Sequence, residues 1–274
     1  MTAMQCYLSI LIPSSLTSES GDPRIKIYKV GQIARSASIF KVGKIIIYKD
    51  PEYDDSKFID LVLRYAETPQ YMRKQLFPLS DELRYVGVIP PLRTPHHPLR
   101  APETGEFREG VVTKVGLGEN AWVDIGVKSP VPLSTDKILQ KGERVTVKIF
   151  SRRPLQVKQA DKDQIPLYWG YQTHISGTLG ETLKAQSKVI ATSKCGEVVD
   201  VKMLSKLREA MKGEISIVFG SPNRGLDTIL EGEGLLLSDL ADHIINTIPN
   251  QGTNTVRTEE AILATLAMLN IIRR

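Results

Sequence analysis

The sequence predicts an α/β protein whose parallel, helix-covered sheet is interrupted near the middle of the chain by a small β-barrel. In both end regions, strand-like and helix-like segments alternate, which is the order typical of a parallel sheet. In the middle region, short alternating segments are separated by glycine turns without a helical pattern, which is typical of a small barrel. We therefore expect a discontinuous α/β domain over residues 1–93 and 165–274, and an inserted, oligonucleotide-binding (OB)-like barrel over residues 94–164.

The first α/β region shows two strand–helix pairs. Apolar and β-branched runs predict the strands, and apolar residues at helical spacing predict the helices. The expected elements are a strand at about 5–12, a helix at 24–37, a strand at 42–48, a helix after Asp54 or Asp55, and a short helix at 71–77.

The barrel region follows an irregular segment at 90–102 that is rich in proline, arginine and histidine. Its expected strands are 110–115, 121–126, 144–150 and 155–157, the first two joined by the glycine turn 116–120. For Trp122 we favour a place in the barrel core over stacking on nucleic acid.

The last region returns to strands and helices. The expected elements are helices at 177–186 and 203–212, strands at 188–191 and 214–219, a helix at 226–230, a strand around 244 and a final helix at 261–272. The final helix is apolar on nearly every face, so we expect it to be buried on two sides. For a helix at the end of a chain, the second side suits a partner subunit.

Composition narrows the class of protein. The 274 residues are 41% hydrophobic, enough for a core, and the net charge of +5 permits a nucleic-acid partner without demanding one. Only two cysteines occur, Cys6 and Cys195, so we expect reduced thiols in a cytoplasmic protein and no disulfide framework. The Cys and His spacing suggests no metal site. The apolar runs are too short to span a membrane.

Two late loops carry the strongest functional signal. Residues 220–226 follow one buried strand, and residues 246–260 join another strand to the final helix. Glycine, proline, asparagine and threonine in these loops permit tight turns and supply hydrogen-bonding groups. Thr258 is expected to cap the final helix. Because parallel sheets bind ligands beyond the carboxyl ends of their strands, the two loops predict a ligand site.

Both loops match a known family. The segments 217–225 and 248–260, with a weaker segment at 189–193 and a likeness at 31–37, resemble the SPOUT superfamily of S-adenosylmethionine-dependent RNA methyltransferases. The resemblance is greatest to the archaeal and eukaryotic branch that carries an inserted β-barrel. It implies a C-terminal trefoil knot, a homodimer formed through the last helix, and S-adenosylmethionine as cofactor.

The resemblance also implies which residues contact the cofactor. An apolar slot for adenine is expected from the two loops, with glycines that let the backbone approach closely. The expected cofactor contacts are Thr192, Phe219, Gly220, Ile248, Pro249, Gly252, Thr255 and Val256.

Arginines are the candidates for catalysis. Arg35 is expected either to bind an RNA phosphate or stabilise an anionic acceptor, or to be a surface residue. Arg257 stands where ribose-methylating SPOUT relatives usually carry asparagine, which leaves base methylation at least as favoured as ribose methylation. Arg224 is expected to hold RNA phosphate or to pair with Glu260. On the barrel, Lys148, Arg152 and Arg153 are the expected RNA contacts, although they also suit a solvated surface.

The sequence thus favours an RNA methyltransferase that uses S-adenosylmethionine and acts on a base of ribosomal RNA. An alternative is a non-catalytic RNA-binding or ribosome-assembly factor that retains the cofactor pocket. A nucleotide-binding α/β enzyme of another kind is disfavoured, because the early strands carry neither a GxGxxG nor a P-loop pattern.

Overall fold

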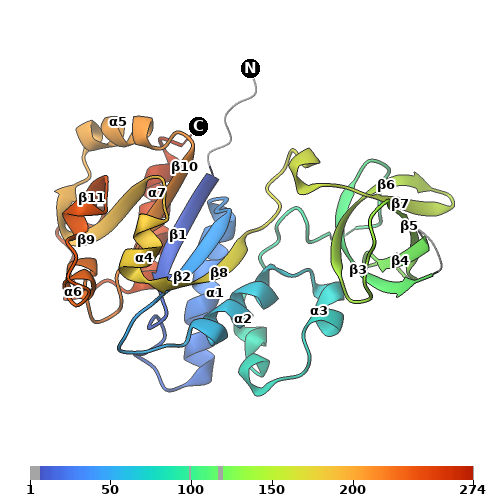
Figure 1. The fold of residues 1–274 in the computed structure, drawn as a ribbon, viewed down its shortest axis with the longest axis horizontal. Coiled ribbons are helices and arrows are strands. Elements are labelled where there is room, and N and C mark those ends of the chain that lie inside the picture. The colour runs from blue at the N-terminus through green and yellow to red at the C-terminus, as the bar shows by residue number, and fades with distance from the viewer. Residues whose placement is uncertain (1–6, 99, 117–119, 274) are drawn as a thin grey trace. The chain divides into compact units, whose positions relative to one another are not determined.

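The computed structural model describes residues 7–98, 100–116 and 120–273 (Figure 1). The chain divides into two compact units. The sheet unit comprises residues up to 64, residues 82–90 and residues from 171 onward, and the barrel unit comprises residues 65–81 and 91–170. The expected insertion, 94–164, lies within the barrel unit, which also takes in residues 65–81. Cys6, the start of the expected strand at 5–12 and most of the expected turn at 116–120 fall outside the described residues.

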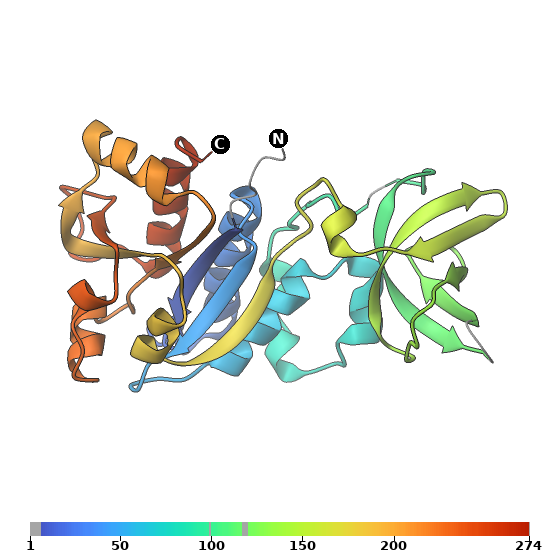
Figure 2. The ribbon, with the colours of Figure 1, turned by 45° about the horizontal axis from the view of Figure 1, so that its top comes forward.

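The sheet unit is built on a parallel sheet. Over the described residues it has six strands in the order β11-β9-β10-β1-β2-β8, and each neighbouring pair is parallel. Figure 2 shows β1, β2 and β8 side by side. This confirms the parallel α/β layer expected from the sequence. The strands are β1 (Tyr7–Pro13), β2 (Lys44–Lys49), β8 (Gln172–Thr178), β9 (Val189–Val198), β10 (Glu214–Val218) and β11 (His243–Asn246).

The edge strand β8 was not among the elements expected from the sequence. Its sequence has a single large apolar residue, Ile175, and most of its positions are exposed or half-buried. A strand is recognised in a sequence by its apolar run, so a polar strand at the edge of the sheet gives little signal.

Helices cover both faces of the sheet and connect its strands. The long helix α1 is set by Asp22, whose side chain accepts a hydrogen bond from the Arg24 N–H, with Pro23 in the first turn. The helices that begin in the sheet unit are α1 (Pro23–Ile39), α2 (Ser56–Glu67), α4 (Leu179–Lys184), α5 (Val201–Ala210), α6 (Leu226–Glu231) and α7 (Thr258–Asn270), with short 3₁₀ turns at Val86–Val88 and Leu237–Asp239. The barrel unit contains α3 (Gln70–Leu76) and a 3₁₀ turn at Lys162–Gln164, and a further turn at Asp81–Leu83 joins the two units along the chain.

The start of α7 differs from the expectation in one respect. Thr258 does not cap the helix, because it is already the first helical residue and Arg257 occupies the cap position. The side chain of Glu260 instead accepts a hydrogen bond from the Arg257 N–H at 3.0 Å. The hydroxyl of Thr258 is thereby available to donate to the Gly220 carbonyl at 3.3 Å, which links the two late loops.

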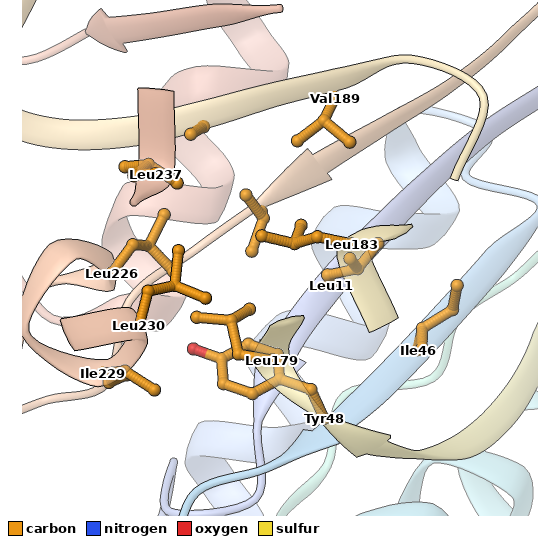
Figure 3. Close-up of a cluster of buried hydrophobic side chains, with 12 residues drawn as sticks. Leu11, Ile46, Tyr48, Leu179, Leu183, Val189, Leu226, Ile229, Leu230 and Leu237 are labelled. Atoms are coloured by element: carbon orange, nitrogen blue, oxygen red, sulfur yellow. The ribbon is translucent and has the colours of Figure 1, made fainter. Parts of the chain in front are cut away.

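One face of the sheet packs on α4 and α6 through a cluster of buried hydrophobic side chains (Figure 3). Side chains from neighbouring strands interdigitate there with leucines and an isoleucine from the two helices. The buried members are Leu11, Ile46, Tyr48, Leu179, Leu183, Val189, Ala191, Val218, Leu226, Ile229, Leu230 and Leu237. The only hydroxyl in this cluster, on Tyr48, donates to the Phe219 carbonyl at 2.8 Å.

The barrel unit contains a closed barrel, in the order β3-β4-β5-β7-β6 over the described residues. Its strands are β3 (Phe107–Val115), β4 (Asn120–Asp124), β5 (Val131–Ser134), β6 (Arg144–Arg152) and β7 (Leu155–Gln159). Inward-facing valines, leucines, isoleucines and an alanine fill the interior.

The expectation that Trp122 belongs to this core is wrong. Alternation along β4 turns Ala121 and Val123 inward, so Trp122 is half-buried on the outside with the Lys114 ammonium 5.2 Å from its ring centroid.

The barrel unit also contains a buried charge network. The guanidinium of Arg144 donates to Glu67 at 2.6 and 3.0 Å and to Glu109 at 2.5 Å. Both carboxylates are almost fully buried. Burial alone would raise the pKa of Glu67, but hydrogen bonds from His96 and Arg144 outweigh it and lower that pKa from 4.5 to about 2. The ionised form of Glu67 therefore stabilises the fold.

The first prediction concerns acid stability. Because the pKa of folded Glu67 lies below its ordinary value, its stabilisation is complete above about pH 4.5 and is lost as the pH falls towards 2. We expect Glu67→Gln to lower the free energy of unfolding by roughly 3 kcal/mol at pH 7 and by much less at pH 3. Urea unfolding followed by tryptophan fluorescence measures this, because Trp122 and Trp169 both lie in the barrel unit.

The matched control is Glu209→Gln, which removes an exposed carboxylate paired with Lys212 and should change little at either pH. A stability difference between wild type and Glu67→Gln that stays constant from pH 7 to pH 3 would contradict this account of Glu67.

Candidate cofactor-binding site

The two late loops line a single cavity of about 480 Å³ at the carboxyl ends of β10 and β11, beside residues 192–195 in the middle of β9. Parallel pairing places the ends of β10 and β11 on the same side of the sheet, so the loops that follow them converge over β9. The volume lies in the range of small-molecule sites. The described lining residues are Thr192, Ser193, Lys194, Cys195, Phe219, Gly220, Ser221, Pro222, Asn223, Arg224, Gly225, Asp227, Thr228, Ile245, Asn246, Thr247, Ile248, Gln251, Asn254, Thr255, Val256, Thr258 and Ala261.

Most of the residues expected to contact a cofactor lie on this cavity. The structure brings together Thr192, Phe219, Gly220, Ile248, Thr255 and Val256. Pro249 and Gly252 are exposed and are not among the described lining residues. A Cβ atom at Gly252 would meet no protein atom within 4 Å, so packing within the chain does not require glycine there.

The first loop is held by backbone hydrogen bonds to the sheet. Phe219 is buried, its N–H donates to Leu11 at 3.1 Å, and its carbonyl accepts from Tyr48. The Thr192 hydroxyl donates to the Val218 carbonyl at 2.9 Å. A Cβ atom at Gly220 would lie 3.1 Å from the Arg224 carbonyl oxygen, so a larger side chain there crowds the turn and the cavity. These contacts fix the first loop against the sheet, on one side of the cavity.

The second loop is held by side-chain amides. Asn246 accepts from the Ile248 N–H at 3.0 Å and donates to the Lys194 carbonyl at 2.8 Å. Gln251 donates to the carbonyls of Thr253 and Asn254 at 2.9 and 3.1 Å. The residue types that marked this segment in the sequence thus fold it back on itself.

Arg224 lines the cavity, but its partners differ from those expected. Its guanidinium pairs with Asp50, whose side chain is 1% exposed, and lies 3.2 Å from the Glu52 carboxylate. Pairing with Glu260 is wrong, because the Glu260 carboxylate accepts the Arg257 N–H instead. Asp50 also accepts from the Ser15 hydroxyl at 2.6 Å and from the Glu52 N–H at 3.1 Å. Arg224 therefore ties the first loop to the segment after β2.

Neither candidate catalytic arginine lies on the cavity of its own chain. Arg257 is exposed at the start of α7. Arg35 is half-buried on α1, 12 residues and about 18 Å along the helix from Pro23, and it is not among the described lining residues. Their roles stay predictions.

Two charged residues of the cavity, Lys194 and Asp227, were not predicted from the sequence. Among the described lining residues, the charged side chains are Lys194, Arg224 and Asp227. Lys194 follows the weak match at 189–193, and its ammonium lies 3.4 Å from the Asn254 carbonyl. Asp227 lies in the first turn of α6, directly after the first loop. Both residues lie directly beside segments that match the family, and this was the one signal in the sequence that could have pointed to them.

The other expected contacts lie on the barrel. Lys148, Arg152 and Arg153 are exposed, the first on the middle of β6 and the others at its end. Within residues 7–98, 100–116 and 120–273, no group of three or more His, Cys, Asp or Glu side chains could hold a metal ion. Across the same described ranges, no helix has the length and hydropathy needed to cross a bilayer.

Comparison with known proteins places the chain in a family. The family described as "Putative RNA methyltransferase" matches residues 7–269, and the chain belongs to it. This confirms the SPOUT RNA methyltransferase class expected from the loops.

Curated relatives match over almost the whole chain. An uncharacterised protein of Haloarcula marismortui is 37% identical over 96% of this chain and 98% of its own length. The 28S rRNA (uridine-N(3))-methyltransferases of Homo sapiens and Mus musculus are each 33% identical over 96% of this chain, and over 77% and 75% of their own lengths.

The cavity suits the cofactor of this class, S-adenosylmethionine. The apolar side chains of Phe219, Ile248 and Val256 offer a slot for an adenine ring. The cofactor also carries hydroxyl, ammonium and carboxylate groups, for which the lining offers both a carboxylate and an ammonium. The residues present therefore fit the cofactor in size and in chemistry.

The second prediction tests the Arg224 tether. Arg224→Met keeps the apolar stem and removes the ion pair with Asp50, so the first loop loses its link to the segment after β2. We expect the dissociation constant for S-adenosylmethionine, measured by calorimetry, to rise about tenfold. Asp50→Asn should act in the same direction. Arg208→Met, at an exposed site on α5 outside the cavity, is the control. Unchanged affinity in a folded Arg224→Met protein would show that the tether has no role in binding.

Proposed function

We propose that this RNA methyltransferase transfers the methyl group of S-adenosylmethionine to N3 of a uridine in ribosomal RNA. The observation that carries the proposal is the cavity formed by the two late loops, in a chain that aligns over 96% of its length with 28S rRNA (uridine-N(3))-methyltransferases. The cavity supports the binding of the cofactor. The activity named for the relatives supports uridine N3 as the acceptor.

Residues of the cavity divide the binding task. When bound, S-adenosylmethionine supplies a methyl group already activated on a sulfonium. We assign the adenine ring to Phe219, Ile248 and Val256, and the ribose hydroxyls or the ammonium to Asp227. We assign the carboxylate of the cofactor to the ammonium of Lys194. Thr192, Gly220 and Thr255 shape the backbone around these groups.

The acceptor imposes a second requirement. A uridine must lose its N3 proton as the new N3–carbon bond forms, and the negative charge then spreads onto the two carbonyl oxygens of uracil. A guanidinium placed against those oxygens stabilises the charge through two hydrogen bonds. Arg35 and Arg257 are the residues that we propose for this role. The arginine at 257, in place of the asparagine of ribose-methylating relatives, supports a base as acceptor.

We also propose a homodimer formed through α7. Leu263 is 46% exposed and Ile271 is 69% exposed, although both are large apolar residues. Together with Ala267 they follow a spacing of four residues, which places them on one face of the helix. The opposite face, with Ile262, Leu266 and Leu269, is buried in the sheet unit. The exposed stripe supports a subunit contact. We further propose the C-terminal trefoil knot that the family resemblance implies.

The third prediction concerns the reaction product. The protein is incubated with labelled S-adenosylmethionine and large-subunit ribosomal RNA from cells that lack its gene, and modified nucleosides are identified by mass spectrometry. We expect N3-methyluridine at one position. Gly220→Val, whose side chain intrudes on the cavity, should abolish both cofactor binding and transfer. Arg35→Ala should retain cofactor affinity while losing transfer by at least about a hundredfold.

The alternatives give different results in the same experiment. A 2′-O-methylated product would overturn the assignment of the base as acceptor. Cofactor binding without transfer to any RNA would favour the ribosome-assembly factor. Transfer at the wild-type rate by Arg35→Ala would remove Arg35 from the reaction.

The fourth prediction concerns the subunit contact. We expect wild-type protein to be a dimer by light scattering and Leu263→Glu to be a monomer, because a carboxylate cannot be buried unpaired in an apolar contact. Arg208→Glu on α5 should leave the dimer intact. A monomeric wild-type protein at micromolar concentration would refute the proposed interface.

A further inference from the structure

A second cavity lies within the barrel unit and is not used by the proposed reaction. Its volume is about 610 Å³, and all of its described lining residues lie between 94 and 169. Aromatic and aliphatic side chains, Phe107, Leu167 and Trp169, line it beside His97 and Arg100. Leu167 is 57% exposed at the rim of this cavity. This set offers flat apolar surface next to positive charge.

The indole of Trp169 is held in one orientation. Its N–H donates to a Glu109 carboxylate oxygen at 2.5 Å. Glu109 is fully buried and is fixed in turn by Arg144 at 2.5 Å and by the Thr146 hydroxyl at 2.7 Å. The Phe107 ring meets the indole nearly edge-on, with the ring centroids 6.4 Å apart. An aromatic surface fixed in advance loses little entropy when a planar ligand stacks on it.

Two lysines continue this surface across the barrel. Lys148 on β6 lies directly opposite Phe107 on β3, with its ammonium 5.3 Å from the ring centroid. Lys148 also lies directly opposite Lys158 on β7, and both lysines are exposed. Like charges opposite each other in an antiparallel pair destabilise the sheet. In the part of the chain that the structure describes, neither lysine forms an ion pair with a carboxylate, so the row suits a bound anion.

The carboxylates at the cavity are already engaged. Glu106 accepts from Arg108 at 3.1 Å and from the Glu103 N–H at 2.7 Å. Glu103 lies 3.6 Å from the Arg100 guanidinium. Burial lowers the pKa of His97 to about 4, so its ring is neutral at pH 7. The cavity is therefore not strongly acidic, and an anionic chain is not repelled from it.

We propose that this cavity binds one unstacked base of a single-stranded RNA segment against Trp169 and Phe107, while Lys148 and Lys158 hold the adjoining phosphates. This inference rests on the proposed function in taking RNA as the substrate, and it adds a recognition site separate from the cofactor cavity. Bases stack on aromatic side chains without strict sequence preference, whereas phosphates require cations at the side of the stack. The row from Trp169 through Phe107 to the two lysines supplies both.

The fifth prediction uses the two tryptophans of the chain as reporters. In Trp122→Phe, the only tryptophan is Trp169, and in Trp169→Phe it is Trp122. An eight-nucleotide single-stranded RNA of mixed sequence is titrated into each protein without S-adenosylmethionine. We expect quenching of Trp169 in the first variant and an unchanged signal from Trp122 in the second. Polyglutamate of matched charge should quench neither, because it brings charge without a base.

Substitutions then separate stacking from charge in the Trp122→Phe background. Phe107→Ala should weaken RNA binding by roughly fivefold or more. Lys148→Ala and Lys158→Ala should each weaken binding and reduce the slope of log affinity against log salt by about 0.7. The control is Lys128→Ala, because Lys128 is also exposed but lies in the loop between β4 and β5. This substitution should leave the RNA affinity and the salt slope unchanged.

Three results would overturn the proposal: RNA binding without quenching of Trp169, quenching of Trp122 instead, or equal quenching by polyglutamate. The assay is independent of methyl transfer, so the two proposals fail separately. Quenching and lysine dependence in a protein that methylates no RNA would refute the proposed function alone. Methyl transfer by a protein whose Trp169 never responds would refute the base-binding site alone.

Discussion

Parallel pairing of β9, β10 and β11 is the constraint on which the candidate cofactor cavity depends. It brings the carboxyl ends of β10 and β11 beside the middle of β9, so that loops distant in the sequence line one cavity. The approach of β11 to β9 is close. A Cβ atom at Gly196 would lie 2.6 Å from the Ile245 backbone, which only glycine avoids. The pairing shifts register between Ile244 and Ile245, where β11 leads into the second loop.

Buried charge has a structural role in both units. Asp50 and Arg224 join two loops in the sheet unit, and Glu67, Glu109 and Arg144 join strands and a helix end in the barrel unit. Each of these ions has its counter-ion within the chain, because a buried charge without a partner costs several kcal/mol. The exposed row of Lys148 and Lys158 lies on the barrel surface, where two neighbouring positive charges that pair with no carboxylate among the described residues suit an anionic ligand.

Part of the site was predictable from local chemistry. The loops at 220–226 and 246–260 were recognisable because their glycine, proline and amide residues suit tight turns after apolar strands. The barrel was recognisable because its strands alternate. The polar edge strand β8 was missed, since an exposed strand carries no apolar run. Trp122 was expected in the barrel core, yet its neighbours Ala121 and Val123 take the inward positions.

The sequence by itself determined the class of fold, the family and the two loops that bound the cavity, because these depend on local pattern and on motif. Only the tertiary structure decided the partners of the charged groups. Arg224 pairs with Asp50, which is 174 residues away, and Trp169 is held by Glu109, which is 60 residues away. Such pairings depend on the order of the strands in the sheet and in the barrel. That order cannot be inferred from the spacing of residues along the chain.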